Sequence, residues 1–166
     1  MSDVHDHNTI IIKWQGPYNY SEIEALKDKG NGLYLASGKV KYQREDSFIQ
    51  YCGITEGSFF NRLKKHHKIW EINREQEFWL GELLVPNATK HFLEMAEKLI
   101  IYFWQPNLNN RKKVLLPKST TVINYWFKKD GSPRKNQMNI YRELPDVLSW
   151  DGKHWRTGNL SVYEDY

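Results

Sequence analysis

Two short cassettes in the sequence each join a tyrosine to a glycine, a combination that could place a phenol beside bare backbone. They are Gly32–Tyr34 (GLY) and Tyr51–Gly53 (YCG), and both stand in stretches with the composition of β-strands. Glycine weakens a strand, so it usually marks a bulge or a place where another group comes close to the backbone. The stretch therefore predicts a two-stranded hairpin with a close approach at each glycine.

Two side chains that could bind an anion follow on a predicted helix. Ser58 is a good N-cap, and the spacing of apolar residues predicts a helix over residues 59–74. Arg62 and His66 would lie one turn apart on this helix, at the edge of its apolar face. An arginine stem can lie along an apolar face without any function. Two cationic or titratable groups together at the edge of a core are less easily explained by packing alone.

A carboxylate holds a similar position on the second predicted helix, over residues 91–105. Glu97 lies at the edge of the apolar stripe of this helix. Because burying an unpaired carboxylate is costly, Glu97 needs a counter-charge, hydrogen-bond donors or a metal ion. A salt bridge to Arg62 would satisfy it, and so would a bound cation. Pro106 ends the helix, and Asn109 follows.

The order of these residues along the chain resembles the GIY-YIG nuclease family. The two tyrosine–glycine cassettes come first, then an arginine in the first helix, and then E-x-x-L-I leading into P-x-x-N at the second helix. The spacing of His66 after Arg62, and of Asn109 after Glu97, is closest to the restriction-endonuclease branch. The resemblance covers residues 30–110, with a leucine and a cysteine in place of the usual isoleucines of the two cassettes.

The resemblance implies an α+β fold with a small antiparallel three-stranded sheet flanked by helices. Residues 30–110 would form the catalytic module. We expect an N-terminal strand and helix before it, and after it a C-terminal extension over residues 111–166 that is rich in β-strands. With 166 residues, of which 40% are hydrophobic, the chain has the size of a single domain over residues 1–166. The extension is expected to contact DNA or to form a dimer.

The resemblance also implies hydrolysis of DNA phosphodiester bonds with one divalent ion, Mg²⁺ or Mn²⁺, per active site. Glu97 would be the metal ligand, and Arg62 would hold the scissile phosphate. Tyr34 would act as the general base or position the attacking water, with Tyr51 orienting water or phosphate and His66 assisting. The asparagine of P-x-x-N would fix the site from behind. The implied catalytic residues are Tyr34, Tyr51, Arg62, His66, Glu97 and Asn109.

Basic residues outside this set are the candidates for holding DNA. The net charge of +4 favours a polyanionic partner. Long basic loops are also found as ordinary solvated turns. The alternative function is therefore a non-catalytic DNA- or RNA-binding module with the same fold, although such a module needs no complete catalytic set. The candidate DNA-binding residues are Lys39, Lys41 and Arg44 in the hairpin loop, and Arg111, Lys112, Lys113, Lys128 and Lys129 in the extension.

The composition also restricts the compartment and the partners. The single cysteine, Cys52, cannot form an intramolecular disulfide. No apolar run reaches membrane-spanning length, and the first residues lack the pattern of a signal peptide. We therefore expect a cytoplasmic protein that acts on double-stranded DNA, without a membrane, as a stand-alone endonuclease of a restriction or mobile-element system. Cutting both strands would require a homodimer or two successive nicks.

Overall fold

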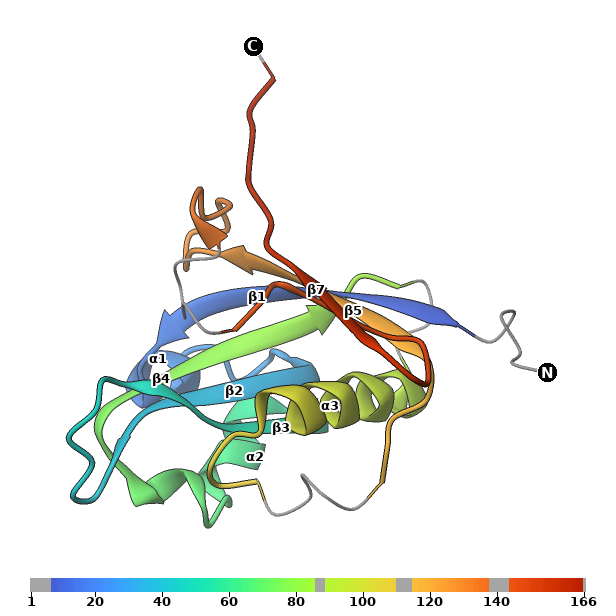
Figure 1. The fold of residues 1–166 in the computed structure, drawn as a ribbon. Helices are drawn as coiled ribbons and strands as arrows, with labels where there is room; N and C mark the ends of the chain where they lie inside the picture. Colours follow the sequence, from blue (N-terminus) through green and yellow to red (C-terminus); the bar gives the residue numbers. More distant parts are fainter. Residues whose placement is uncertain (1–6, 86–88, 110–114, 138–143, 166) are drawn as a thin grey trace.

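The backbone is organised around one mixed β-sheet (Figure 1). The structure is a computed structural model that describes residues 7–85, 89–109, 115–137 and 144–165. Within them the sheet has seven strands in the order β3-β2-β4-β1-β5-β6-β7. The elements are β1 (Asn8–Tyr18), α1 (Tyr20–Glu24), β2 (Gly30–Val40), β3 (Phe48–Ser58), α2 (Phe59–Lys64), a 3₁₀ turn (Ile69–Glu71), β4 (Ile72–Leu83), α3 (Lys90–Trp104), β5 (Thr120–Phe127), β6 (Val147–Trp150) and β7 (Trp155–Gly158).

The prediction of a small three-stranded sheet is wrong. β3, β2 and β4 do pair antiparallel, but the other edge of β4 pairs with β1, and β1 pairs in parallel with β5. In this parallel pair Trp14 lies beside Trp126, more than a hundred residues further along the chain. The resemblance spans only residues 30–110, and no local pattern encodes a pairing between such distant segments. The three strands of the expected module are therefore one end of a larger sheet.

Helix α2 is much shorter than the predicted helix over residues 59–74. Ser58 is its N-cap, as expected, but the helix ends at Lys64. His66 lies beyond it, and its Nδ1 atom accepts hydrogen bonds from the backbone N–H groups of Lys68 and Ile69 over 3.1 and 3.3 Å. A continuing helix would use these N–H groups in its own hydrogen bonds, so the histidine side chain takes the place of further turns.

The helices cover opposite faces of the sheet. Side chains alternate along β2, so Leu33 and Leu35 pack on the side of α3, whereas Tyr34 and Ala36 pack on the side of α1 and α2. Figure 1 shows α3 lying along the sheet, with α2 on the other side of β3. The core is therefore split into two layers, and the hairpin of β2 and β3 separates the candidate residues of α2 from Glu97 of α3.

The C-terminal strands belong to the same sheet, and the prediction that residues after 110 are rich in β-strands is confirmed for β5, β6 and β7. A buried carboxylate ties them together. Asp146 accepts hydrogen bonds from Trp126 Nε1 over 2.9 Å and from the backbone N–H of Leu160 over 2.8 Å. None of the described helices is both long enough and apolar enough to cross a membrane.

Candidate active site

A buried phenol lies at the centre of the hairpin. β2 places Tyr34 between Gly53 of β3 and Leu80 of β4, on the face that α2 covers. The Tyr34 side chain has no exposed surface, and its hydroxyl group has no hydrogen-bond partner among the described residues. Leaving a buried hydroxyl unpaired costs about 1–3 kcal/mol, so such a group is uncommon in a folded protein. The hydroxyl position is maintained at a cost in stability, which marks it as a candidate for chemistry.

The glycines of the two cassettes make room for protein groups. A Cβ atom added at Gly53 would overlap the ring and hydroxyl of Tyr34, and one added at Gly32 would overlap the carbonyl oxygen of Gly81 and the ring of Phe59. The resemblance would leave the sheet bare at both glycines for a DNA backbone, but the groups that come close to them here belong to the protein. The group at Gly53 is the tyrosine of the other cassette, whereas Gly32 is approached by Gly81 and Phe59 and not by Tyr51.

Three rings form a cluster around this phenol. The rings of Tyr34 and Tyr51 are stacked with centroids 6.1 Å apart, and the ring of His66 meets Tyr51 edge-on at 4.5 Å. Since Nδ1 of His66 accepts two backbone hydrogen bonds, its ring proton is on Nε2. Burial, together with the nearby positive charges of Arg62, His67 and Lys68, lowers the pKa of His66 to about 4. His66 is therefore neutral at pH 7 and can donate a hydrogen bond through Nε2.

The charge of Arg62 acts on this cluster from the last turn of α2. Its side chain is exposed, and no ion pair joins it to Glu97 in the part of the chain that the structure describes. Burial raises the pKa of the Tyr34 phenol far above its ordinary value, Tyr51 raises it further, and Arg62 opposes the rise. An exposed guanidinium beside a buried phenol can hold a phosphate group next to it.

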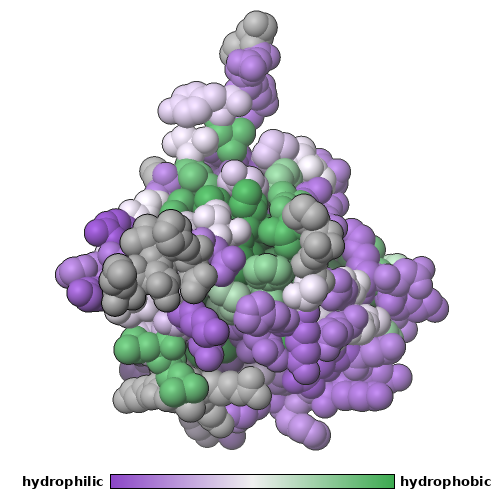
Figure 2. Space-filling model, turned by 90° about the vertical axis from the view of Figure 1, so that its right-hand side faces the viewer, coloured by the Kyte–Doolittle hydropathy of each residue, from purple (hydrophilic) through white to green (hydrophobic). Residues whose placement is uncertain are grey.

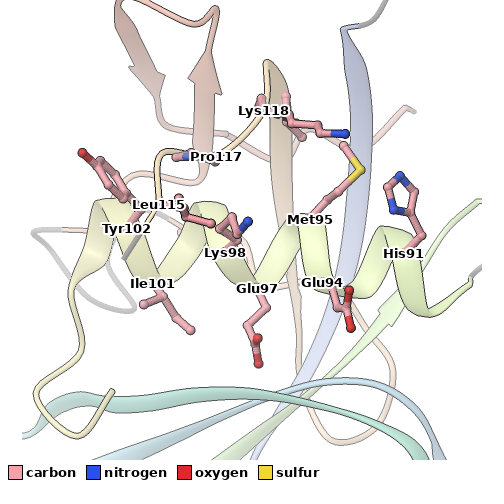
Figure 3. A pocket seen from close by; sticks show the side chains of 11 residues that line it. His91, Glu94, Met95, Glu97, Lys98, Ile101, Tyr102, Leu115, Pro117 and Lys118 are labelled. Carbon is pink, nitrogen blue, oxygen red and sulfur yellow. Dashed lines mark hydrogen bonds between the residues drawn. The ribbon is translucent and has the colours of Figure 1, made fainter. Parts of the chain in front are cut away.

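Glu97 contributes a negative charge from the other layer. It is 9% exposed, within the buried stripe of α3, and its charge raises the pKa of both Tyr34 and Cys52. Figure 3 shows the Glu97 carboxylate pointing from α3 toward the strands below. Although Arg62 and Glu97 lie on different helices, the charges of both shift the pKa of Tyr34, in opposite directions.

The described residues offer few ligands for a metal ion. Among them no three His, Cys, Asp or Glu side chains form a cluster that could hold one. The candidate oxygen donors are the Glu97 carboxylate, whose charge acts on Tyr34, and the Tyr34 hydroxyl. Mg²⁺ is commonly bound by one or two carboxylates together with waters and substrate phosphate. Glu97 would be the protein ligand of such an ion.

Asn109 fixes the outer edge of the hairpin. It is 5% exposed, and its side-chain amide accepts from the N–H of Cys52 and donates to the C=O of Cys52, each over 2.9 Å. The neighbouring Leu108 donates its backbone N–H to Gln50 over 2.8 Å. Gln50, a fully buried residue that the sequence did not single out, also bonds to Gly38 and Gln43 of the hairpin loop. Only its position next to Tyr51 could have drawn attention to it.

The candidate DNA-binding residues do not form one cluster around the site. Lys39 pairs with Glu75 over 3.4 Å at the hairpin loop. Lys129 pairs with Glu22 over 2.8 Å, and Lys128 precedes it at the end of β5. The remaining candidates are Lys41 and Arg44, which are exposed in the hairpin loop, and Arg111, Lys112 and Lys113, which lie outside the described residues.

A cavity of about 580 Å³ lies elsewhere, between α3 and the segment over residues 115–120. Figure 3 shows the side chains around it, with His91, Met95 and Lys118 on the side of α3 opposite to the Glu97 carboxylate. Glu97 is one of the residues that line this cavity, whereas Tyr34, Tyr51, Arg62 and His66 are not. The candidate active site is therefore the ring cluster at the hairpin.

The structure brings the tyrosines and His66 into ring contact and places the charges of Arg62 and Glu97 where both act on Tyr34. Comparisons with family models, curated proteins and solved structures find no match for this chain. A function therefore has to be argued from this arrangement of side chains and from its chemistry.

Proposed function

We propose that the protein is a metal-dependent endonuclease that hydrolyses phosphodiester bonds of double-stranded DNA. The observation that carries the proposal is the unpaired, buried hydroxyl of Tyr34, on which the charges of Arg62 and Glu97 both act. A guanidinium and a carboxylate that both act on one phenol suit a reaction in which water attacks an anionic phosphate. A cytoplasmic, stand-alone enzyme of a restriction or mobile-element system is the setting that agrees with its motif spacing.

Each residue of the candidate site has its own role in the proposed reaction. Arg62 holds the scissile phosphate and offsets the negative charge that develops as the water oxygen bonds to phosphorus and the bond to the leaving oxygen breaks. Tyr34 and Tyr51 position the water, and His66 orients Tyr51. Glu97 would hold a divalent ion, which would supply Lewis acidity and stabilise the leaving oxygen.

Tyr34 acts as a neutral phenol in the free protein. Its pKa is raised far above the ordinary value by burial, so at pH 7 it positions water through its hydroxyl group instead of standing ready as a phenolate. The positive charge of Arg62 already opposes this rise. Because the hydroxyl is fully enclosed, a neighbouring side chain has to move when the phosphate enters.

Cleavage by matched variants of α3 tests the proposal. Wild type, Glu97→Gln and Glu94→Gln are incubated with supercoiled plasmid and a linear duplex, with Mg²⁺, Mn²⁺ or EDTA. Glu94 is the control, because it lies about one turn earlier on α3 and its carboxylate is exposed. We expect Glu97→Gln to lose about 10²-fold or more of the cleavage rate, and Glu94→Gln to keep it.

Two results would contradict the nuclease. One is cleavage by wild type that survives EDTA, and the other is an unchanged rate in Glu97→Gln. The assay also reports nicked and linear products separately, which distinguishes single-strand from double-strand cleavage. Discrete fragments from the linear duplex would support a restriction-like enzyme.

The enclosed position of Tyr34 also favours a second candidate, a module that binds DNA or RNA without cutting it. Tyr34 is a neutral phenol with no exposed surface, so packing of the hairpin alone would account for it without any catalytic role. This candidate predicts that wild type and Glu97→Gln shift DNA equally on a gel and that neither cuts it with any metal ion.

A further inference from the structure

β7 lies at the end of the sheet and pairs, within the described residues, only with β6. Such an edge is a template for another strand unless charges, prolines or a covering segment block it. β7 holds only the residues Trp155–Gly158, but the chain continues beyond it.

The continuation is an extended arm over residues 159–165. Figure 1 shows it leaving the sheet and projecting away from the body, and Figure 2 shows hydrophobic side chains near its base and hydrophilic ones toward its tip. Tyr163 near the tip is 89% exposed. The base is held in place, because the backbone N–H of Leu160 bonds to the buried Asp146. The base of the arm is therefore fixed to the fold, whereas the rest of the arm projects away from it.

The charges of this segment are arranged for antiparallel pairing with itself. Arg156 of β7 and His154 of the preceding turn already lie beside Asp151, so Lys153 is the basic residue left to face a partner, whereas the tip carries Glu164 and Asp165. Two identical strands that run antiparallel about Asn159 bring Lys153 opposite Asp165 and Trp155 opposite Tyr163. Opposite charges and aromatic pairs across two strands each stabilise the pairing by about 0.2–1 kcal/mol.

We propose that β7 and the C-terminal arm pair antiparallel with the same segment of a second copy of this chain, which forms a symmetric dimer. A two-fold axis through the arm repeats each contact twice and joins the two sheets edge to edge. The acidic tip of the arm argues against DNA as its partner, because carboxylates repel phosphates. The dimer holds whether or not the chain is a nuclease. In a nuclease it would carry one site for each strand of a duplex.

Charge exchange between the two ends of the segment tests this pairing. The molar mass of the full chain is measured by light scattering and sedimentation over a range of concentrations, for Lys153→Asp, Asp165→Lys and the double exchange. Each single variant places like charges opposite each other at two equivalent positions, so we expect its dimer to weaken about tenfold or more. The double exchange restores opposite charges, and we expect it to restore the dimer.

A matched control changes an exposed carboxylate away from the arm. Glu45→Lys, in the loop between β2 and β3, alters the net charge as Asp165→Lys does and should leave the dimer unchanged. Since Lys153 and Asp165 are both exposed, all variants should keep the thermal unfolding of the wild type. A wild type that stays monomeric at high micromolar concentration would overturn the proposal. A dimer whose affinity neither single exchange changes would also overturn it. So would a monomeric wild type whose affinity for DNA is changed by the variants of the arm.

Discussion

Tyr34 is a residue whose position works against the stability of the fold. Its ring fills the space above Gly53, but its hydroxyl has no hydrogen-bond partner, and burial keeps the phenol neutral. A phenylalanine would fill the same space without an unpaired polar atom. The cost of retaining the hydroxyl therefore separates a functional tyrosine from one that only packs the core.

Tyr34→Phe should raise the free energy of unfolding or leave it unchanged, because it removes an unpaired buried hydroxyl worth about 1–3 kcal/mol. If the hydroxyl positions the attacking water, the same variant should lose DNA cleavage. Urea unfolding and the plasmid assay measure the two effects. Tyr18→Phe, a change at another buried tyrosine of the same core layer, is the control and should keep full activity. A destabilised Tyr34→Phe that still cuts DNA would contradict this assignment.

His66 should make stability depend on pH. The unfolded histidine has a pKa near 6.5, whereas the pKa of His66 is lowered to about 4 in the folded protein. Between these values the unfolded state binds the proton, so the free energy of unfolding falls as pH decreases from about 6.5 to about 4, by at most about 3 kcal/mol. His66→Asn keeps an acceptor for the N–H groups of Lys68 and Ile69 and should flatten this fall. Urea unfolding at several pH values measures it, with His67→Asn as a control that should keep the slope.

At the scale of elements, the site is held by side chains that replace regular backbone bonds. His66 ends α2 by bonding two N–H groups that a longer helix would use. Asn109 bonds both backbone groups of Cys52, as a neighbouring strand would. These two residues fix the end of α2 and the outer edge of β3, the elements that carry Arg62 and Tyr51.

Asn109→Ala should destabilise the protein and loosen the edge of β3. It leaves the N–H and C=O of Cys52 buried without partners, at about 1–3 kcal/mol for each group. Asn107→Ala, which removes a single exposed contact of 3.2 Å to Gln50, is the matched control and should cost far less. Hydrogen exchange at the N–H of Cys52, together with urea unfolding, measures the effect. Equal stability losses in the two variants would refute the role given to Asn109.

The sequence predicted the order of the elements better than their arrangement in the sheet. Strand composition and helical spacing were enough for β2, β3 and α3, because these signals are local. The length of α2 was wrong because a single ring, that of His66, ends it. The glycine positions were read correctly as close approaches, but the group that approaches Gly53 comes from the partner strand, which only the pairing register reveals.

At the scale of the whole molecule, β1 joins the expected module to the C-terminal strands. Its Trp14 is fully buried, packs against Gly81 of β4 and stacks on Trp126 of β5 with ring centroids 5.8 Å apart. Trp14 also donates a hydrogen bond to Asn124 over 2.7 Å. One strand thus supplies core contacts to both halves of the sheet, and nothing within residues 30–110 replaces it.

The fragment over residues 30–110 should therefore fail to fold alone. Without β1 the edge of β4 and the apolar surface around Trp79 and Gly81 lose their cover. We expect near-ultraviolet circular dichroism of the fragment without fixed aromatic signals, and no cooperative thermal transition, whereas the full chain should show both. A fragment that melts cooperatively would mean that the module is independent of β1.

The two borders of the sheet are unlike, and this limits how copies of the protein can assemble. At the β3 border the amide of Asn109 already occupies the backbone groups of Cys52. At the other border, no strand of the described chain pairs with the outer edge of β7. A sheet with two unpaired edges can add further copies at both edges and grow into a filament. A sheet with one unpaired edge can pair with only one partner and stops at a dimer. Asn109 therefore acts as a stop against fibrous growth.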